Sequence, residues 1–313
     1  MIENLENIYI YIDDNLNIEL NPDFKVMSAW AKNISIAINS DEGISYYKIS
    51  GDKISCETVN ITKLEDIIVR MIKGNNMNSL VISDCDLVDL YEKKKFDNSY
   101  EFTDDELGRG IDIGLGIEYY GNAKYVLFEA EDLNEDYLRS VFFRKIGKPL
   151  EIFRTERLII REMCLDDMPA YIKLYDSLKS CDFVEKLYPY DEEVEFVKNY
   201  IQNMYTFFGY GLWLVFKKDS NELIGRAGIE NREIDGETKQ EIGYLIGKAY
   251  QGKGYAYEAC QGILDYARTV LNFDELFACV HKENFPSIAL AEKLGFRIYA
   301  RDVGEMNIYR IEI

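Results

Sequence analysis

The chain has 313 residues, of which 47% are apolar and 29% are charged. This composition is ordinary for folded domains and excludes a disordered, collagen-like or coiled-coil chain. The length predicts two domains. The net charge of -20 repels phosphate backbones and anionic lipid, so we expect neither nucleic acid nor a membrane as a partner.

We expect neither a membrane-spanning segment nor a secretory signal in this sequence. No apolar run approaches the roughly 20 residues that span a bilayer, and the acidic N-terminal stretch lacks the basic start of a secretory signal. Six cysteines are scattered singly, without a CxxC pair, and indicate reduced thiols in a cytoplasmic protein. The single histidine, His281, excludes a multi-histidine metal site, and we expect no metal.

The first half of the chain alternates strand and helix patterns. We expect a strand at 7–12, a hairpin at 44–54, a helix at 63–73, a strand at 79–82, a helix at 87–95, a strand at 125–129 and a helix at 134–145. This order predicts an α/β module with a small parallel sheet. The sequence KIGKP at 145–149 interrupts the pattern, so we expect one domain over 1–149 and a second over 150–313.

One string in the first half suggests chemistry. Asp84 and Asp86 follow the strand at 79–82 in a DxDxV pattern, which resembles the nucleophile motif of haloacid-dehalogenase-type phosphatases. There, two aspartates could hold Mg²⁺ while one attacks phosphorus. The motif lies far from the start of the chain, and the two aspartates also suit a cap for the helix at Leu87. We therefore interpret this half as a degenerate, Rossmann-like companion module of unassigned role.

The second half begins with a strand at 157–161, and Asp166 and Asp167 are expected to cap the helix that follows. The further elements predicted are helices at 168–178 and 192–207, strands at 212–217, 223–230 and 240–246, a long helix from 255 to about 271, a strand at 276–280, a helix at 285–293, and strands at 297–302 and 307–311.

The turn at 251–254 carries the clearest signal for a ligand. Gly252 and Gly254 leave the backbone open where a strand runs into a helix, and the first helical N–H groups have no partner within the helix. The helix dipole adds about half a positive charge there. A diphosphate site made of amides is the functional interpretation, with Lys253 as an added cation. The alternative is a tight turn whose glycines serve backbone geometry alone.

Three separated motifs resemble the GNAT acetyltransferases. The sequence QGKGYA at 251–256 fits the family signature Q/R-x-x-G-x-G/A, while NFPS at 284–287 and EKLGF at 292–296 are similar to its later segments. The sequence TERLIIR at 155–161 resembles the branch that includes ribosomal-protein and polyamine N-acetyltransferases. The resemblance covers roughly residues 152–313. It implies a mixed, mostly antiparallel sheet flanked by helices. Together with the first half of the chain, we expect this α/β fold to follow an additional N-terminal α/β domain.

The resemblance implies an N-acetyltransferase that moves the acetyl group of acetyl-CoA directly to a primary amine of a small molecule or of a peptide N-terminus. Backbone N–H groups of the turn would hold the pyrophosphate. The edge of the strand before it would pair with the pantetheine, and a backbone N–H there would polarise the thioester. The residues implied in cofactor binding are Leu245, Ile246, Gln251, Gly252, Lys253, Gly254, Tyr255, Ala256, Asn284 and Ser287.

For the catalytic base we favour Glu241, acting through water, and take Glu230 as the second candidate. The alternative for both is a solvated or salt-bridged strand carboxylate. Many family members carry a tyrosine just before EKLGF, but this chain has Ala291 there. The source of the proton for the departing thiolate is therefore open between water and three side chains, Tyr257, Tyr299 and Ser287, and the alternative is departure as the unprotonated thiolate.

The acceptor is expected at the early helices of the second half, where aromatic and acidic residues are dense and suit a cationic amine. These residues are Tyr171, Tyr175, Phe183, Tyr188, Tyr190, Tyr205, Phe207, Phe208, Tyr210, Asp182, Glu185, Asp191, Glu192 and Glu193. The alternative is core packing and solvated helix faces. His281 could touch CoA or the acceptor, or end its strand structurally. The alternative function is a catalytically silent CoA- or amine-binding sensor, and a homo-oligomer is open.

Overall fold

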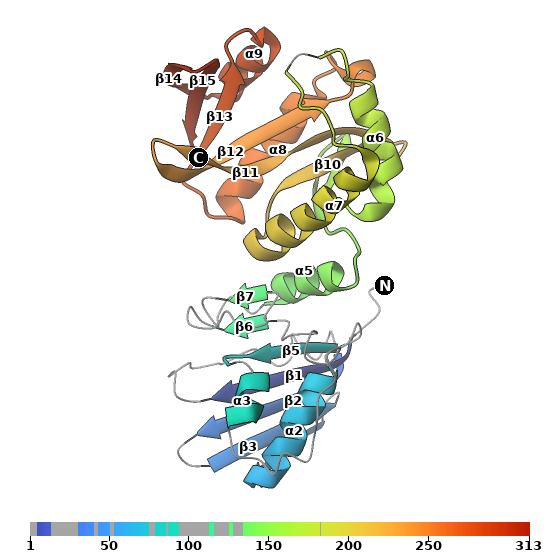
Figure 1. Ribbon diagram of the computed structural model, residues 1–313, viewed down its shortest axis with the longest axis vertical. Coiled ribbons are helices and arrows are strands. Elements are labelled where there is room, and N and C mark those ends of the chain that lie inside the picture. The colour runs from blue at the N-terminus through green and yellow to red at the C-terminus, as the bar shows by residue number, and fades with distance from the viewer. Residues whose placement is uncertain are drawn as a thin grey trace. The chain divides into compact units, whose positions relative to one another are not determined.

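The computed structural model describes residues 5–13, 31–40, 43–50, 53–74, 79–85, 87–93, 113–115, 125–127, 134–181 and 183–313. The chain divides into two compact units, residues 1–146 and 147–313 (Figure 1). Each is described by itself below. Among the described helices, none is both long and apolar enough to cross a membrane.

The first unit is built on one sheet. Its described strands lie in the order β4 (Lys53–Val59), β3 (Gly43–Ser50), β2 (Ala31–Ser40), β1 (Leu5–Asp13), β5 (Ser79–Ser83), β6 (Ile113–Leu115), β7 (Tyr125–Leu127). Strands β2, β1, β5, β6 and β7 run parallel, and β3 and β4 add an antiparallel hairpin. The predicted parallel module and hairpin are confirmed. Strand β2 is absent from the sequence prediction, and the hairpin turn at 51–52 lies outside the described residues.

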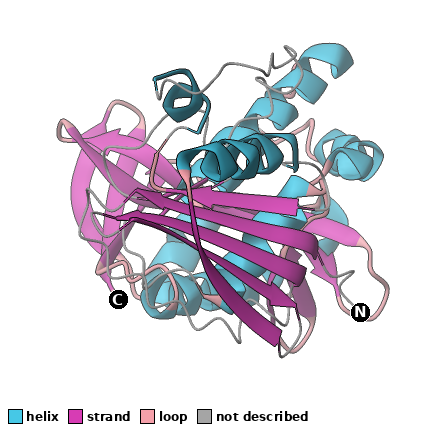
Figure 2. Cartoon of the chain, turned by 90° about the horizontal axis from the view of Figure 1, so that it is seen from below, coloured by secondary structure: helices cyan, strands magenta, loops and turns pink. Residues whose placement is uncertain are grey.

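Helices cover both faces of this sheet, as Figures 1 and 2 show. Ile8 and Ile10 pack on one face with Leu138 of α5 (Glu135–Lys145). Tyr11 packs on the other face with Ile68 of α2 (Ile61–Gly74). Successive strand residues point to opposite faces, so strands buried on both sides need the continuous apolar runs seen in β1 and β5. The described helices are α2 (Ile61–Gly74), α3 (Leu87–Lys93) and α5 (Glu135–Lys145), which confirms the three helix predictions within the described residues.

The second unit has one sheet of eight strands. Their order is β14 (Arg297–Val303), β15 (Met306–Glu312), β13 (Glu275–His281), β12 (Glu237–Ile246), β11 (Leu223–Ile234), β10 (Leu212–Lys217), β9 (Leu158–Arg161), β8 (Glu151–Arg154). Every neighbouring pair is antiparallel except β12 and β13. The predicted mixed, mostly antiparallel sheet is confirmed. The short edge strand β8 is absent from the prediction.

Helices lie on both faces of this second sheet (Figure 1). Helices α6 (Met168–Asp176) and α7 (Tyr190–Tyr200) lie on one face and α8 (Tyr255–Thr269) on the other. The predicted helix at 192–207 begins two residues earlier and changes to a π-helix after Tyr200, before Gly209 ends it at a φ of 78°. The helical elements are η3 (Leu165–Asp167), α6 (Met168–Asp176), α7 (Tyr190–Tyr200), η4 (Ile201–Phe208), η5 (Lys248–Tyr250), α8 (Tyr255–Thr269) and α9 (Phe285–Leu294).

The predicted helix caps at Asp166 and Asp167 need a correction. Asp167 is buried, and its carboxylate accepts a hydrogen bond from the Cys164 backbone N–H at 2.9 Å and pairs with Arg161 at 2.6 Å. Its side chain makes no capping bond to α6, and Asp166 is exposed. Asp167 therefore fixes the turn before the helix to strand β9. The Asp167 carboxylate pairs with Arg161 and does not cap the helix, because charge-assisted hydrogen bonds to a guanidinium are the stronger interaction.

We expect Asp167→Asn to lower the free energy of unfolding by about 2–3 kcal/mol near pH 7. Burial pushes the pKa of the Asp167 carboxyl up, but hydrogen bonds from Arg161 and Cys164 outweigh it and hold the pKa below its usual range. The ion pair therefore adds stability that is present above about pH 4 and is lost as the pH falls through the lower folded pKa. Urea unfolding at several pH values measures both effects.

Asp265→Asn is the matched control for this prediction, because Asp265 pairs with Arg268 at 2.9 Å with its side chain 71% exposed. An exposed pair contributes about 0–1 kcal/mol, so this variant should unfold almost as the parent does. A loss in Asp167→Asn that is equally small, or that is the same at all pH values, would contradict the assignment.

Candidate functional site

The turn between β12 and α8 has the backbone that an anion site needs. Gly252 and Gly254 have φ angles of 73° and 82°, in the left-handed region that favours glycine. The first hydrogen bond of the helix runs from the Glu258 N–H to the Gly254 carbonyl, at 3.1 Å. By helix geometry, the N–H groups of residues 255–257 have no partner within the helix and point out of its end. This end can hold an anion.

Side chains around the turn brace it. The Gln251 amide donates to the Ile246 carbonyl at 2.9 Å, which ties the turn to the end of β12. The Lys253 ammonium donates to the Ala249 carbonyl at 2.8 Å and lies 5.4 Å from the Tyr250 ring centre. Gln251 and Lys253 are predicted to bind the ligand, but in this structure both side chains form hydrogen bonds within the loop.

Arg157, a residue of the TERLIIR motif to which the sequence assigned no role, lies beside this turn. Its guanidinium pairs with Glu258 at 2.6 Å, donates to the Lys253 carbonyl at 3.1 Å and lies 4.5 Å from the Tyr255 ring centre. A methyl group at Gly254 would lie 3.4 Å from its Nη2. Arg157 thus places a cation at the N-terminus of α8, partly neutralised by Glu258.

Strands β12 and β13 separate to form a cleft. Their parallel register contains a single pair, Glu241 with Phe277, whereas β12 stays paired with β11 through Ile246. A cavity of about 390 Å³ lies where they diverge, and the predicted residues Asn284 and Ser287 line it. Asn284 also caps α9, because its side chain accepts from the Ser287 N–H at 3.3 Å. The edge of β12 beyond Glu241 therefore lacks a β13 partner.

The two predicted base candidates are direct partners in the β11–β12 register, so their side chains lie on the same face. Glu241 forms an ion pair with Arg232 and accepts the Cys279 N–H at 3.0 Å. Burial raises the pKa of the Glu241 carboxyl, against the lowering effect of Arg232. Glu230 accepts the Tyr200 hydroxyl at 3.0 Å. Glu241 lines the cleft.

Two further residues of the cleft were not singled out from the sequence. Tyr244 lines it and donates its hydroxyl to the Ser287 carbonyl at 3.1 Å. Burial raises the pKa of Tyr244, so the phenol keeps its proton. Cys279 also lines the cleft, and burial together with Glu241 raises the pKa of its thiol to about 12. Tyr244 and Cys279 both lie on strands, and a local sequence pattern does not distinguish such site residues from ordinary core residues.

The three side chains predicted as proton donors to the thiolate lie in different places. Ser287 lines the cleft, but Tyr257 and Tyr299 do not. Tyr257 lies in the first turn of α8 and accepts from Gln261 at 2.8 Å, and Tyr299 donates to Asp235 at 2.8 Å. Ala291, at the position where the family often has tyrosine, is buried.

His281 has the structural role that was one of its two predicted interpretations, and its contact with CoA or the acceptor stays a prediction. Its Nδ1 accepts the Glu283 N–H at 3.2 Å at the end of β13, and its Nε2 lies 3.6 Å from Glu305. Its ring packs on Phe183 with ring centres 5.0 Å apart, and both side chains line the cleft.

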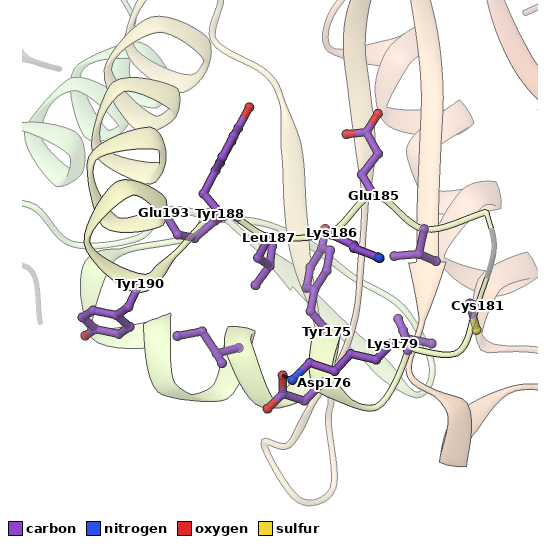
Figure 3. Close-up of a pocket in the computed structure, with 13 residues that line it drawn as sticks. Tyr175, Asp176, Lys179, Cys181, Glu185, Lys186, Leu187, Tyr188, Tyr190 and Glu193 are labelled. Atoms are coloured by element: carbon purple, nitrogen blue, oxygen red, sulfur yellow. Dashed lines mark hydrogen bonds and ion pairs between the residues drawn. The ribbon is translucent and has the colours of Figure 1, made fainter.

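A second cavity, of about 560 Å³, lies between α6, the segment before α7 and the start of α7 (Figure 3). It shares Val184 and Glu185 with the cleft. The acceptor residues predicted from the sequence divide into groups. Tyr175, Glu185, Tyr188, Tyr190 and Glu193 line this second cavity. Tyr171, Tyr205 and Tyr210 belong to the core, Asp191, Glu192, Phe207 and Phe208 are exposed, and Asp182 lies outside the described residues.

The phosphatase-like string of the first unit gains no support. Asp84 is buried at the end of β5, and Asp86 lies outside the described residues. Within the part of the chain that the structure describes, no group of three or more His, Cys, Asp or Glu side chains could hold a metal ion.

Comparison with known proteins decides the family. Residues 157–297 match the model of the acetyltransferase (GNAT) domain. The "Uncharacterized N-acetyltransferase p20" of Bacillus licheniformis is 32% identical over 152 residues, which are 47% of this chain and 83% of p20. The chain belongs to the GNAT acetyltransferase family. The resemblance inferred from the sequence is thereby confirmed, and the GNAT domain and the relative named as an N-acetyltransferase support an acyl-CoA-dependent acetyltransferase.

Other relatives match in part. The "Uncharacterized protein YkkB" of Bacillus subtilis (strain 168) is 34% identical over 100 residues, 32% of this chain, and the chain spans 58% of YkkB. The solved structure of an acetyltransferase from Agrobacterium tumefaciens str. C58 is 29% identical, with a TM-score of 0.44, and covers 51% of this chain and 94% of its own.

Proposed function

We propose that residues 150–313 form the acetyltransferase domain and move the acetyl group of acetyl-CoA directly to a primary amine in the β12–β13 cleft. The observation that carries this proposal is the single parallel pair at Glu241 and Phe277. It leaves an open strand edge that leads from the cleft to the glycine turn at residues 252–254. An extended amide arm that ends in a diphosphate suits both features, because strand edges bind amides and helix N-termini bind phosphates.

Direct transfer requires a neutral amine, a polarised thioester and a proton for the thiolate. The amine nitrogen attacks the thioester carbonyl carbon while a backbone N–H near Leu245 or Ile246 stabilises the oxyanion. The C–S bond then breaks. Glu241 takes the proton that the amine loses, through water. Its raised pKa brings this carboxylate closer to the basicity that a general base needs near neutral pH.

Tyr244 and Ser287 are the groups of this chain placed to give the thiolate its proton, since both line the cleft. We expect Tyr244→Phe to lower kcat about tenfold or more while the KM for acetyl-CoA stays unchanged. Tyr299→Phe is the control, because that hydroxyl bonds Asp235 on a different part of the sheet. Steady-state kinetics tests this; equal kcat values for the two variants would remove Tyr244 from the reaction.

A catalytically silent sensor is the second candidate function. Two observations favour it: Ala291 replaces the frequent tyrosine, and Glu241 is held by both Arg232 and the Cys279 N–H. A thiol-release assay with an amine panel separates the two functions. Acetyl-CoA should stabilise the protein by about 2.7 kcal/mol at a hundred times Kd in either case. Binding without release of CoA by any amine would favour the sensor.

For the rest of the molecule we propose a companion role of the first unit in interaction or ligand sensing. No disulfide joins the cysteines of the described residues, which supports the cytoplasmic location proposed from the sequence.

A further inference from the structure

The cavity of about 560 Å³ beside the cleft has a size typical of small-molecule sites, which run from about 300 to 1,000 Å³. Its walls are largely apolar or aromatic and come from α6, the segment before α7 and the start of α7. The side chains that form this wall include Ile172, Tyr175, Leu178, Val184, Leu187 and Tyr188. The bulk of a bound molecule would therefore meet hydrocarbon. Two lysines, Lys179 and Lys186, also line this cavity, so its charged lining carries both signs.

Two of the three carboxylates that line this cavity are engaged within the protein. Asp176 pairs with Lys179 at 2.8 Å. Glu193 is 2% exposed and accepts the Tyr188 N–H at 2.9 Å. The third, Glu185, is exposed and lies where the cavity adjoins the cleft. Figure 3 shows Glu185 well apart from the Asp176–Lys179 pair.

Negative charge collects at the cleft end. Glu241 lines the cleft with Glu185, and Glu230 lies opposite Glu241 on the same face of the sheet. Arg232, which pairs with Glu241 and feels the charge of Glu185, offsets part of this charge. An acceptor that spans the two cavities would thus meet carboxylates at one end and apolar walls along its body.

We infer that the acceptor is a hydrophobic monoamine: one ammonium near Glu185 and an aromatic or branched apolar body in the larger cavity. The inference rests on the proposed function and names the substrate class of that site. A polyamine fits worse, because its second and third ammonium groups would lie against apolar walls whose own carboxylates are engaged, and a buried charge without a partner is costly.

Thiol release with phenethylamine, tryptamine and 3-methylbutylamine, compared with spermidine and putrescine, tests the inference. We expect kcat/KM to be about tenfold or more higher for the hydrophobic amines. A higher kcat/KM for spermidine would overturn the inference and leave the proposed function standing. If no amine releases CoA, the proposed function fails, and thermal shift decides the inference: phenethylamine must then stabilise the protein more than spermidine does, and the reverse overturns it.

Leu187→Asp places a carboxylate on the apolar wall of the larger cavity. We expect kcat/KM for phenethylamine to fall about tenfold or more and the preference to shift toward spermidine, with an unchanged Kd for acetyl-CoA. Leu165→Asp is the matched control, because Leu165 is 41% exposed and lines neither cavity. An unchanged ratio of the two amines in Leu187→Asp would overturn the inference.

If Leu187→Asp does not fold, Tyr188→Ser replaces it. Tyr188 lines the same cavity but is 58% exposed, so its removal should leave the fold intact. The loss of its ring should lower kcat/KM for phenethylamine severalfold and leave that for putrescine unchanged. Equal effects on the two amines would contradict the assigned substrate class.

Discussion

Glu241→Gln is expected to lower kcat about 100-fold or more, with the Kd for acetyl-CoA changed by less than about twofold. The amide keeps the size of the side chain and its acceptor for the Cys279 N–H, but it cannot take a proton from the amine. Glu237→Gln is the matched control. It changes the same residue type on the same strand, at a side chain that is 70% exposed and pairs with Lys239. Steady-state kinetics and calorimetry give the two quantities.

The pH dependence adds a second readout for Glu241. Because burial raises the pKa of this carboxyl above its usual value of about 4.3–4.5, kcat/KM should fall as the pH drops through the raised pKa. That limb should disappear in Glu241→Gln. The folded state also holds this proton more tightly than the unfolded chain, so the ionised Glu241 lowers stability at neutral pH relative to acid. A kcat unchanged in Glu241→Gln but lost in Glu230→Gln would move the base to Glu230.

Gly252→Ala is expected to raise the Kd for acetyl-CoA about tenfold or more, which corresponds to about 1.4 kcal/mol of lost binding energy. A phosphate that contacts backbone N–H groups needs the space that the new methyl group takes. Among the described residues, none apart from the two chain neighbours lies within 4 Å of that methyl position, so the effect on binding would come from the ligand side. Calorimetric titration of the variant with acetyl-CoA measures it.

Gly304→Ala is the matched control for the turn. Gly304 has a φ of 65° and equally open space around its Cβ position, but it lies in the turn between β14 and β15. The free energy of unfolding should fall by about 1–2 kcal/mol in both variants, because alanine is strained in the left-handed region. Only Gly252→Ala should lose affinity for acetyl-CoA. Equal Kd values in the two variants would show that the turn does not hold the diphosphate.

Local patterns were sufficient for most of the fold. The strands near 212–217 and 240–246 and the helix after the glycine turn follow directly from apolar periodicity and from glycine at a helix start. Strand β2, Ala31–Ser40, was missed although Ile34, Ile36 and Ile38 alternate with more polar residues and Ile34 and Ile36 pack in the core, so this strand was predictable from its pattern. Edge strand β8 has four residues and is defined by its pairing with β9, which a local window does not contain.

The candidate site was predictable to the same extent. The glycines and strand carboxylates belong to local motifs, so the sequence indicated them. The side chains that share the cleft depend on where β12 and β13 diverge, which no local pattern encodes. Hence Tyr244 was missed, while Tyr257 and Tyr299 remained candidates until their positions were known. The ion pair of Glu241 with Arg232 likewise depends on strand register.

The central claim is that this chain holds acetyl-CoA along the open edge of β12, with its diphosphate on the glycine turn. The most direct measurement is a crystal structure of the protein with acetyl-CoA. We predict diphosphate oxygens within hydrogen-bond distance of backbone N–H groups of residues 252–257, and the thioester beside Glu241 in the β12–β13 cleft. Acetyl-CoA bound at any other surface, with the cleft and the turn left empty, would contradict the account.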